Sequence, residues 1–422
     1  MANVNGNFTQ PVPLGLVPSF GYGDRLGLAT PGHLAAHRGS GFAPIFAQQS
    51  IREMARTNRT PEEVMAAARK ALLAARYGEP WGADADHLKT REDVERTAAA
   101  GFCFFTIDPS EYVANGADNM DMEGLTAAVA AQNADDLYGG SSVESLYEGK
   151  TYSVGGMDLV FTKETLYRAA VKYGRAIAHC QKMAGYIHET NPGRLYEIEV
   201  SVDETDSPTS ALEHLFFALE LRRRGITVVS LAPRFIGEFE KGIDYKGDLK
   251  AFEESLKVHV SIAREFGPYK ISVHSGSDKF SIYPIIGRVC ENLLHVKTAG
   301  TSYLEALRVV ARSDVPLFRE IVTYSGGRFS EDKVSYHISV TDADVPGLLQ
   351  AADDQLEQVF LNEDKGRQVL HVTFGSVLTK GNTHAGRPFK DAILSLLHAH
   401  ADLHAEVLES HLGKHLKALR AG

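Results

Sequence analysis

Cysteine is scarce in this chain. Only Cys103, Cys180 and Cys290 occur, far apart in the sequence and without a CxxC pair. Neither a disulfide framework nor a metal site built from thiolates is therefore expected. Because reduced thiols are typical of the cytoplasm, we expect a cytoplasmic protein.

Long apolar runs and blocks of basic residues are also missing. No stretch reaches the roughly 18 apolar residues of a membrane span, and residues 1–15 lack the basic region and apolar core of a secretory signal. The formal charge is −10, and Lys and Arg are scattered along the chain. We therefore expect neither a membrane nor a nucleic acid as a partner, and a small molecule is the expected ligand.

The chain does contain short β-rich runs that alternate with helical patterns. Its 422 residues, 44% hydrophobic and 23% charged, can bury the core of one large barrel or of two or three smaller domains. Strands are predicted at 19–24, 82–87, 102–107, 196–202, 227–231, 270–274, 293–297 and 369–374. Because strands that alternate with helices form parallel sheets, this pattern predicts an α/β fold, a (β/α)8 TIM-like barrel.

Helical patterns separate these strands. The clearest follows Thr60, which suits an N-cap, with Pro61 at the first helical position. Helices are expected at 61–77, 163–189, 210–224, 248–266 and 302–312, with a long amphipathic helix or helix pair at 390–419. Segments 108–167 and 313–368 are longer than barrel loops need to be. We therefore predict a single domain over residues 1–422, in which these two insertions cover the carboxyl face of the barrel.

Polar residues gather where the predicted strands end. Barrel enzymes carry their chemistry on the loops at the carboxyl ends of the strands. Here the second strand ends in Asp86-His87, the fourth runs into Glu204, and the sixth ends in His274. An imidazole can hold a divalent cation, and an adjacent carboxylate can move a proton. The pattern therefore predicts metal-assisted chemistry at this face.

Several longer strings carry a family resemblance. Residues 20–27, 46–53, 84–89, 201–210 and 269–280 together resemble the tagaturonate epimerase family, which also includes tagatose 4-epimerases. The resemblance extends from about Val17 to about Lys380. It implies a metal-dependent isomerase that interconverts D-tagaturonate and D-fructuronate, or the matching ketohexoses, in hexuronate breakdown.

A second, local likeness suggests a mechanism. Asp86-His87 and residues 273–277 are similar to the Asp-His pair and the phosphate-loop strand of class II, metal-dependent aldolases. The stereocentre to be inverted is β to the ketone, so its C–H is not acidified as an α-proton is. Retro-aldol cleavage followed by aldol addition avoids that difficulty. Asp86 is expected to accept the hydroxyl proton and Glu204 to return it; the two roles can be reversed, and Asp203 or Glu199 is an alternative to Glu204.

The expected cofactor is a divalent cation, Zn²⁺, Ni²⁺, Co²⁺ or Mn²⁺, held by neutral imidazoles. His87 and His274 are the first two expected ligands. The third is His337, in the second insertion, with His371 and His295 as alternatives. Candidates for the substrate carboxylate are Arg25, Arg234 and Lys297. Candidates for its hydroxyls are Gln49, Ser275, Ser277 and Asp278.

Two other functions fit the same residues. A class II-type aldolase would release free three-carbon products. A sugar-acid-binding barrel without catalysis would bind its ligand with no metal requirement. A homo-oligomer is also left open, because the amphipathic segment 390–419 suits either an interface or packing on the barrel.

Overall fold

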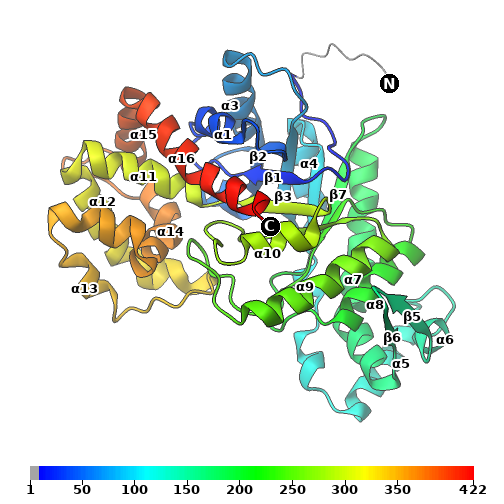
Figure 1. Cartoon of the computed structure of the whole chain (residues 1–422). Helices are drawn as coiled ribbons and strands as arrows, with labels where there is room; N and C mark the ends of the chain where they lie inside the picture. The colour runs from blue at the N-terminus through cyan, green and yellow to red at the C-terminus, as the bar shows by residue number, and fades with distance from the viewer. Residues whose placement is uncertain (1–8) are drawn as a thin grey trace.

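Parallel strands form a closed barrel in the computed structural model, which describes residues 9–422 (Figure 1). The barrel strands are β1 (Ser19–Tyr22), β2 (Ala43–Ser50), β3 (Gly82–Leu88), β4 (Phe104–Ile107), β7 (Glu197–Ser201), β8 (Ser230–Ala232), β9 (Lys270–Val273) and β10 (Leu294–Thr298). They lie in the order β1, β10, β9, β8, β7, β4, β3, β2, and β2 pairs with β1 to close the barrel. The predicted TIM-like fold is confirmed.

Helices surround this barrel. Their bounds are α1 (Thr30–His37), α2 (Ile51–Thr57), α3 (Pro61–Ala74), α4 (Arg91–Ala100), α5 (Met122–Ala134), α6 (Val143–Tyr147), α7 (Lys163–Thr190), α8 (Ala211–Arg223), α9 (Leu249–Phe266), α10 (Tyr283–Cys290), α11 (Thr301–Ser313), α12 (Val315–Asp332), α13 (Val345–Leu349), α14 (Asp364–Thr379), α15 (Phe389–Ala399) and α16 (Ala401–Arg420). Successive members of the outer ring contact one another in the order α1, α3, α4, α7, α8, α9, α10 and α16, and α16 returns to α1.

Local sequence explains where these helices begin. The Thr60 side chain accepts a hydrogen bond from the backbone N–H of Glu63, and the Glu63 side chain accepts one from the backbone N–H of Thr60. This reciprocal cap, with Pro61 next in the chain, starts α3 at the predicted position. The segment predicted as a long helix or helix pair is the pair α15 and α16.

One predicted strand is wrong and one strand was missed. Residues 369–374 lie within α14, where every residue from Gly366 to Phe374 is buried. A short apolar run that is buried on all sides has no helical periodicity to distinguish it from a strand. The missed strand is β2, which carries Pro44 near its start and the adjacent amides Gln48 and Gln49. Proline and consecutive polar residues are uncommon in a buried parallel strand, so the sequence pattern concealed it.

The two long connections take different places. In the first, α5, α6 and the antiparallel pair β5 (Thr151–Val154) and β6 (Met157–Val160) pack on α7, α8 and α9. The second belongs to a helical assembly in which α11, α12, α14 and α15 share an apolar core of their own. In Figure 1 this assembly lies beside the barrel, with α11 in yellow, α12 and α14 in orange shades and α15 closer to red.

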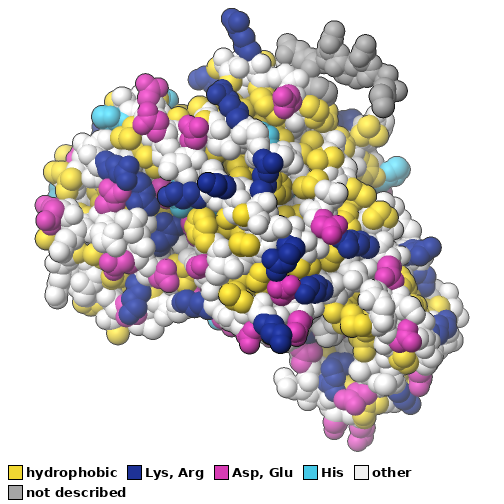
Figure 2. Space-filling model, in the orientation of Figure 1, with side chains coloured by type: hydrophobic (Ala, Val, Ile, Leu, Met, Phe, Trp, Pro, Cys, Tyr) yellow, Lys and Arg dark blue, Asp and Glu magenta, His cyan; other side chains and the backbone are white. Residues whose placement is uncertain are grey.

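The surface is mixed in character. On the face drawn in Figure 2, basic and acidic side chains are interspersed among apolar ones. Within residues 9–422, no helix combines the length and the apolar composition that crossing a membrane requires.

Candidate active site

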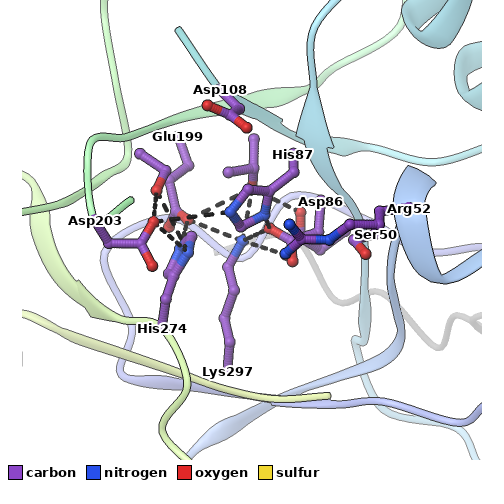
Figure 3. A network of polar contacts seen from close by, with 12 residues as sticks. Ser50, Arg52, Asp86, His87, Asp108, Glu199, Asp203, His274 and Lys297 are labelled. Carbon is purple, nitrogen blue, oxygen red and sulfur yellow. Dashed lines mark hydrogen bonds and ion pairs between the residues drawn. The ribbon is translucent and has the colours of Figure 1, made fainter. Parts of the chain in front are cut away.

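His87 lies at the carboxyl end of β3, where the strand is irregular. The register between β3 and β4 shifts between Ala85 and Leu88, and the His87 backbone is left-handed with φ of 57°. In a regular strand Asp86 and His87 would face opposite sides of the sheet. The bulge lets both line one cavity, where Nδ1 of His87 lies 2.9 Å from Oδ1 of Asp86 (Figure 3). Non-glycine residues with a left-handed backbone occur preferentially at functional sites.

His274 directly follows β9 and lies beside His87, with the two ring centroids 5.2 Å apart. Its Nε2 is 2.6 Å from Oε1 of Glu199, and its Nδ1 is 3.3 Å from Oδ1 of Asp203. Burial opposes protonation of this ring, but Asp203 and Glu199 outweigh it and raise the pKa of His274 to about 9. The imidazole pair is thus surrounded by negative charge.

The donors around the two rings fit a divalent cation. Ligand atoms of Asp86, His87 and His274 all lie within 4.8 Å of one another. Neither ring nitrogen of His87, both buried, makes a well-formed hydrogen bond to any residue of the described chain. Carboxylate oxygens of Asp86, Asp203 and Glu204 nevertheless lie 2.9, 3.7 and 3.9 Å from those nitrogens. Two imidazoles that converge with carboxylates, one of them without a well-formed hydrogen bond at either nitrogen, form a suitable ligand set for such an ion.

The three histidines considered as a third ligand lie in different places. His337 is 70% exposed, and its Nε2 is 2.6 Å from Oε2 of Glu238, so the structure does not bring it to the imidazole pair. His295 lies inside the barrel, where its Nδ1 is 2.9 Å from the hydroxyl of Ser19. His371, on α14, lines the same cavity as His87, and its Nδ1 has no hydrogen bond within residues 9–422.

Carboxylates flank His87 on both sides. Asp86 faces Nδ1, whereas Glu204, in the loop after β7, faces Nε2 and also lies 2.9 Å from a guanidinium nitrogen of Arg52. Asp203 lies near the nitrogens of both rings. Asp108 joins His87 and Glu204 in a second group with metal-binding geometry. Proton acceptors therefore stand on two sides of the imidazole pair.

Lys297 is enclosed by acids inside the barrel. Its Nζ lies 2.7 Å from Asp84, 2.8 Å from Asp86 and 2.8 Å from Glu199. Burial opposes the ammonium form, but the three carboxylates raise the pKa of Lys297 well above its usual value, and Asp84 has the largest effect among them. Burial also raises the pKa of Asp84 to about 7, although Lys297 acts against it. The three N–H groups of Lys297 are thus committed to the protein, which leaves it poorly suited to bind a substrate carboxylate.

Arg25 and Gln49 share one acidic partner. Nε and Nη2 of Arg25 donate to Oε1 of Glu53 at 3.0 and 2.5 Å, and Nε2 of Gln49 donates to Oε2 at 3.0 Å. The guanidinium carbon of Arg25 lies 3.5 Å from the ring centroid of Phe374. Nη1 of Arg25 is buried and has no hydrogen bond within the described chain, so it remains available to a ligand oxygen.

The remaining predicted substrate contacts divide into two groups. Ser275 and Ser277 line the cavity, and Arg234 lines its outer part while donating a hydrogen bond to the carbonyl of Thr205. Asp278 lies outside this cavity. Its oxygens are 2.8 Å from Arg367 of α14 and 2.9 Å from His411 of α16, so it anchors the loop after β9 to two helices.

Two adjoining cavities make up the site. The inner one, of about 50 Å³, contains Asp86 and His87, and the outer one, of about 260 Å³, contains Glu204. Both are lined by Arg52, Asp203, Lys241, His274, Ser275 and Tyr336. Residues 335–337 of the second insertion contribute to the outer wall. Segment 109–162, which is fully described, contributes no residue to either lining.

Several residues of the site were missed from the sequence. Arg52 and Glu53 follow the missed strand β2, so its omission concealed them. Asp84 precedes Asp86 by two residues, and the alternation of a strand places such residues on one face, which was a usable signal. Lys241 and Tyr336 lie in irregular segments, where spacing carries no comparable information.

Known proteins resemble this chain along almost its whole length. The family model described as tagaturonate epimerase matches residues 3–419. A tagaturonate/fructuronate epimerase of Thermotoga maritima is 44% identical over 410 residues, which cover 97% of this chain and 82% of that protein. Crystal structures of a fructuronate-tagaturonate epimerase of Cohnella laeviribosi, one native and one complexed with glycerol, are 38% identical with a TM-score of 0.91. Each alignment covers 98% of this chain, with 84% of the native chain and 83% of the complexed one. The chain is therefore an epimerase that belongs to the tagaturonate epimerase family.

Proposed function

We propose that this enzyme interconverts D-tagaturonate and D-fructuronate with the help of a divalent cation, by reversible cleavage of a carbon–carbon bond. The names of its relatives support the substrates. The observation that carries the chemistry is His87, whose two unbonded ring nitrogens face the carboxylates of Asp86 and Glu204 from opposite sides, beside His274. A metal position with proton acceptors on both sides is what the reaction needs.

His87 and His274 would hold the cation. Asp203 is the most suitable third ligand, because one of its oxygens lies 3.7 Å from Nε2 of His87 and 3.3 Å from Nδ1 of His274. Asp86 also lies close enough to both imidazoles to serve as a ligand. Its oxygens, however, already accept hydrogen bonds from Lys297 and Gln48. When bound, the cation supplies Lewis acidity to the ketone of the substrate.

The carboxylates account for the proton transfers. Asp86 removes the proton from the hydroxyl on the carbon β to the ketone, and that carbon becomes an aldehyde as its bond to the α carbon breaks. The bonding electrons pass to the other half of the substrate, which becomes an enediolate. After the aldehyde turns, the α carbon attacks its opposite face, and Glu204 relays a proton from solvent to the new alkoxide. Asp86 then returns its proton to solvent.

The enclosure of the site supports this scheme. An aldehyde released to solvent would end the reaction as an aldol cleavage, so both halves must be retained. Tyr336, on the segment from the second insertion, lines both cavities, and its hydroxyl accepts a hydrogen bond from the guanidinium of Arg56 in α2. This contact ties the covering segment to the barrel.

Proton NMR of the metal-loaded protein tests the proposal. We expect each of tagaturonate and fructuronate to give the other, and chelation to stop the reaction until Zn²⁺, Ni²⁺, Co²⁺ or Mn²⁺ is restored. Tagatose and fructose in the same panel define the substrate range. Free three-carbon products would identify an aldolase instead, and unchanged substrate with metal present would contradict the proposed function.

A cytoplasmic location is part of the proposal. Its support is the state of the cysteines, since Cys103, Cys180 and Cys290 are all buried and unpaired. Free thiols are typical of reducing compartments.

A further inference from the structure

The cationic side chains of the cavity differ in how their charges are compensated. Arg25 is paired with Glu53, Arg52 with Glu204, and Lys297 with three buried acids. Lys241 is different, because its ammonium nitrogen contacts the hydroxyl of Ser275 at 2.5 Å and has no carboxylate within 4.0 Å among residues 9–422. Its charge is therefore available to a ligand.

Arg234 also has no carboxylate partner in the described chain, but it is less well placed. Its guanidinium donates a hydrogen bond to the carbonyl of Thr205, and the side chain lines the outer cavity but not the inner one. Lys241 lines both cavities and contacts the residue next to His274. A substrate that reaches the imidazole pair must therefore pass close to Lys241.

The loop that carries Lys241 is held by buried cations on either side of it. Nζ of Lys279 donates to the carbonyls of Glu240 at 2.8 Å and Ile243 at 2.5 Å, and Nε of Arg367 donates to the carbonyl of Gly242 at 2.7 Å. These bonds fix the backbone around Lys241 without using its side chain. An ammonium group on an anchored loop is preorganised for an anion, which lowers the entropic cost of binding.

The charge of the cavity makes such a group necessary. Asp86, Asp203 and Glu204 all lie within 4 Å of His87, so an entering carboxylate meets repulsion from several acids. An unpaired ammonium group offsets that repulsion and forms a charge-assisted hydrogen bond. A neutral ketose has no need of it.

We propose that Lys241 binds the carboxylate of the substrate and makes the site selective for ketouronates over neutral ketoses. This inference rests on the proposed function. Cleavage between the α and β carbons leaves the carboxylate on the aldehyde half, two bonds from the aldehyde carbon. Lys241 therefore retains that half while the aldehyde turns, and the carboxylate serves as the pivot.

Steady-state kinetics of Lys241→Met test the assignment. Since the carboxylate is bound equally before and during the reaction, we expect KM for tagaturonate to rise about tenfold to a hundredfold with little change in kcat. Lys241→Arg keeps the charge and should retain most of the affinity. Lys250→Met, which removes an 86% exposed lysine on α9, is the matched control and should behave like the wild type.

Chemical rescue separates charge from structure. The natural cysteines are all buried, so 2-bromoethylamine should alkylate Lys241→Cys selectively and recreate an ammonium group at that position. KM should fall back toward the wild-type value. D-glycerate should also inhibit the wild type more strongly than glycerol, and Lys241→Met should abolish that preference.

The outcomes distinguish the two proposals. Wild-type epimerisation together with an unchanged KM in Lys241→Met would overturn the role of Lys241 and leave the proposed function intact. A fall in kcat that alkylation does not restore would also overturn it, because it would indicate a structural role. An inactive wild type would overturn both.

Discussion

The ammonium nitrogen of Lys297 lies 2.8 Å from Oε1 of Glu199, inside a barrel whose interior at this level is ionic (Figure 3). Barrels of this fold usually fill that space with branched aliphatic side chains. Glu199 is also 2.6 Å from Nε2 of His274, so the network that contains Lys297 directly supports an imidazole of the candidate site.

Replacing Lys297 by Met should destabilise the protein strongly. Three buried carboxylates would lose their shared cation, and breaking a buried pair by removing one partner costs about 3–5 kcal/mol. Urea unfolding measures the loss, and Lys250→Met, on the surface, should stay within about 0.5 kcal/mol of the wild type. Adding Asp84→Asn should recover part of the loss, since it removes one uncompensated charge. An equally stable Lys297→Met variant would show that the network is not ionised.

Metal content should separate ligands from neighbours. His87→Ala, His274→Ala and Asp203→Asn should lose the bound cation, as measured by mass spectrometry of the purified proteins. Asp86→Asn should keep the metal but lose at least about a hundredfold in turnover, because it removes the proton acceptor. His337→Ala should keep the metal, since that side chain faces Glu238. Full metal content in His87→Ala would exclude it as a ligand.

A methyl group at Gly300 should displace His371. A Cβ built there would lie 2.0 Å from Nε2 of His371, a contact that the lining of the inner cavity must relieve by moving. We expect Gly300→Ala to lose about 1–3 kcal/mol of stability and much of its activity. Gly327→Ala is the matched control, because a Cβ there meets nothing within 4 Å inside α12 and should stabilise the helix by about 0.5–1 kcal/mol. Equal kcat in the two variants would exclude a role for the position of His371.

Acid should weaken the fold through His259. Its Nδ1 lies 2.8 Å from Nδ1 of His214, and burial lowers the pKa of His259 to about 4. Below pH about 6.5 His259 binds a proton in the unfolded chain but stays neutral in the folded chain. The free energy of unfolding therefore falls as the pH decreases toward 4. Between pH 6.5 and 5 this loss is about 1.5 kcal/mol for one such histidine. Urea unfolding of His259→Gln at both pH values should show a correspondingly smaller decrease, and an identical decrease would contradict this assignment.

Solvent deuterium tests carbon–carbon cleavage separately from the epimerase activity. In D₂O, cleavage and re-addition leave the hydrogen on the inverted carbon in place, whereas deprotonation of that carbon would exchange it. Proton NMR of the product should therefore show full intensity at this position. Deuterium at the inverted carbon would rule out the cleavage mechanism while leaving the activity established.

The barrel could be predicted because alternating strands and helices leave a clear pattern, as at β3 and α3. The proximity of His87 and His274 followed from the same logic, since both lie at the carboxyl ends of parallel strands. The predictions that failed concern single elements. Residues 369–374 are apolar throughout, so the helix α14 gave no periodicity, and Gln48 and Gln49 made β2 look like a loop.

The finer assignments of the site were beyond the reach of spacing. The sequence places His337 in an insertion, and the path of a long connection is decided by packing that no short pattern encodes. Lys297 is a cation at a predicted strand end, but its partners Asp84 and Glu199 come from two other strands. Only the closed barrel brings those three charges together.

The contact between the first and last helices of the outer ring governs how the chain can be assembled. In Figure 1 the red helix α16 lies beside α1, and α16 packs on both α1 and α10. Strand β1 likewise needs β10 as a neighbour, from almost three hundred residues later in the chain. The N-terminal elements therefore keep apolar surface exposed until β10 and α16 have been synthesised and have left the ribosome. Closure of the barrel and of its outer ring thus depends on segments made several hundred residues after β1 and α1 have emerged.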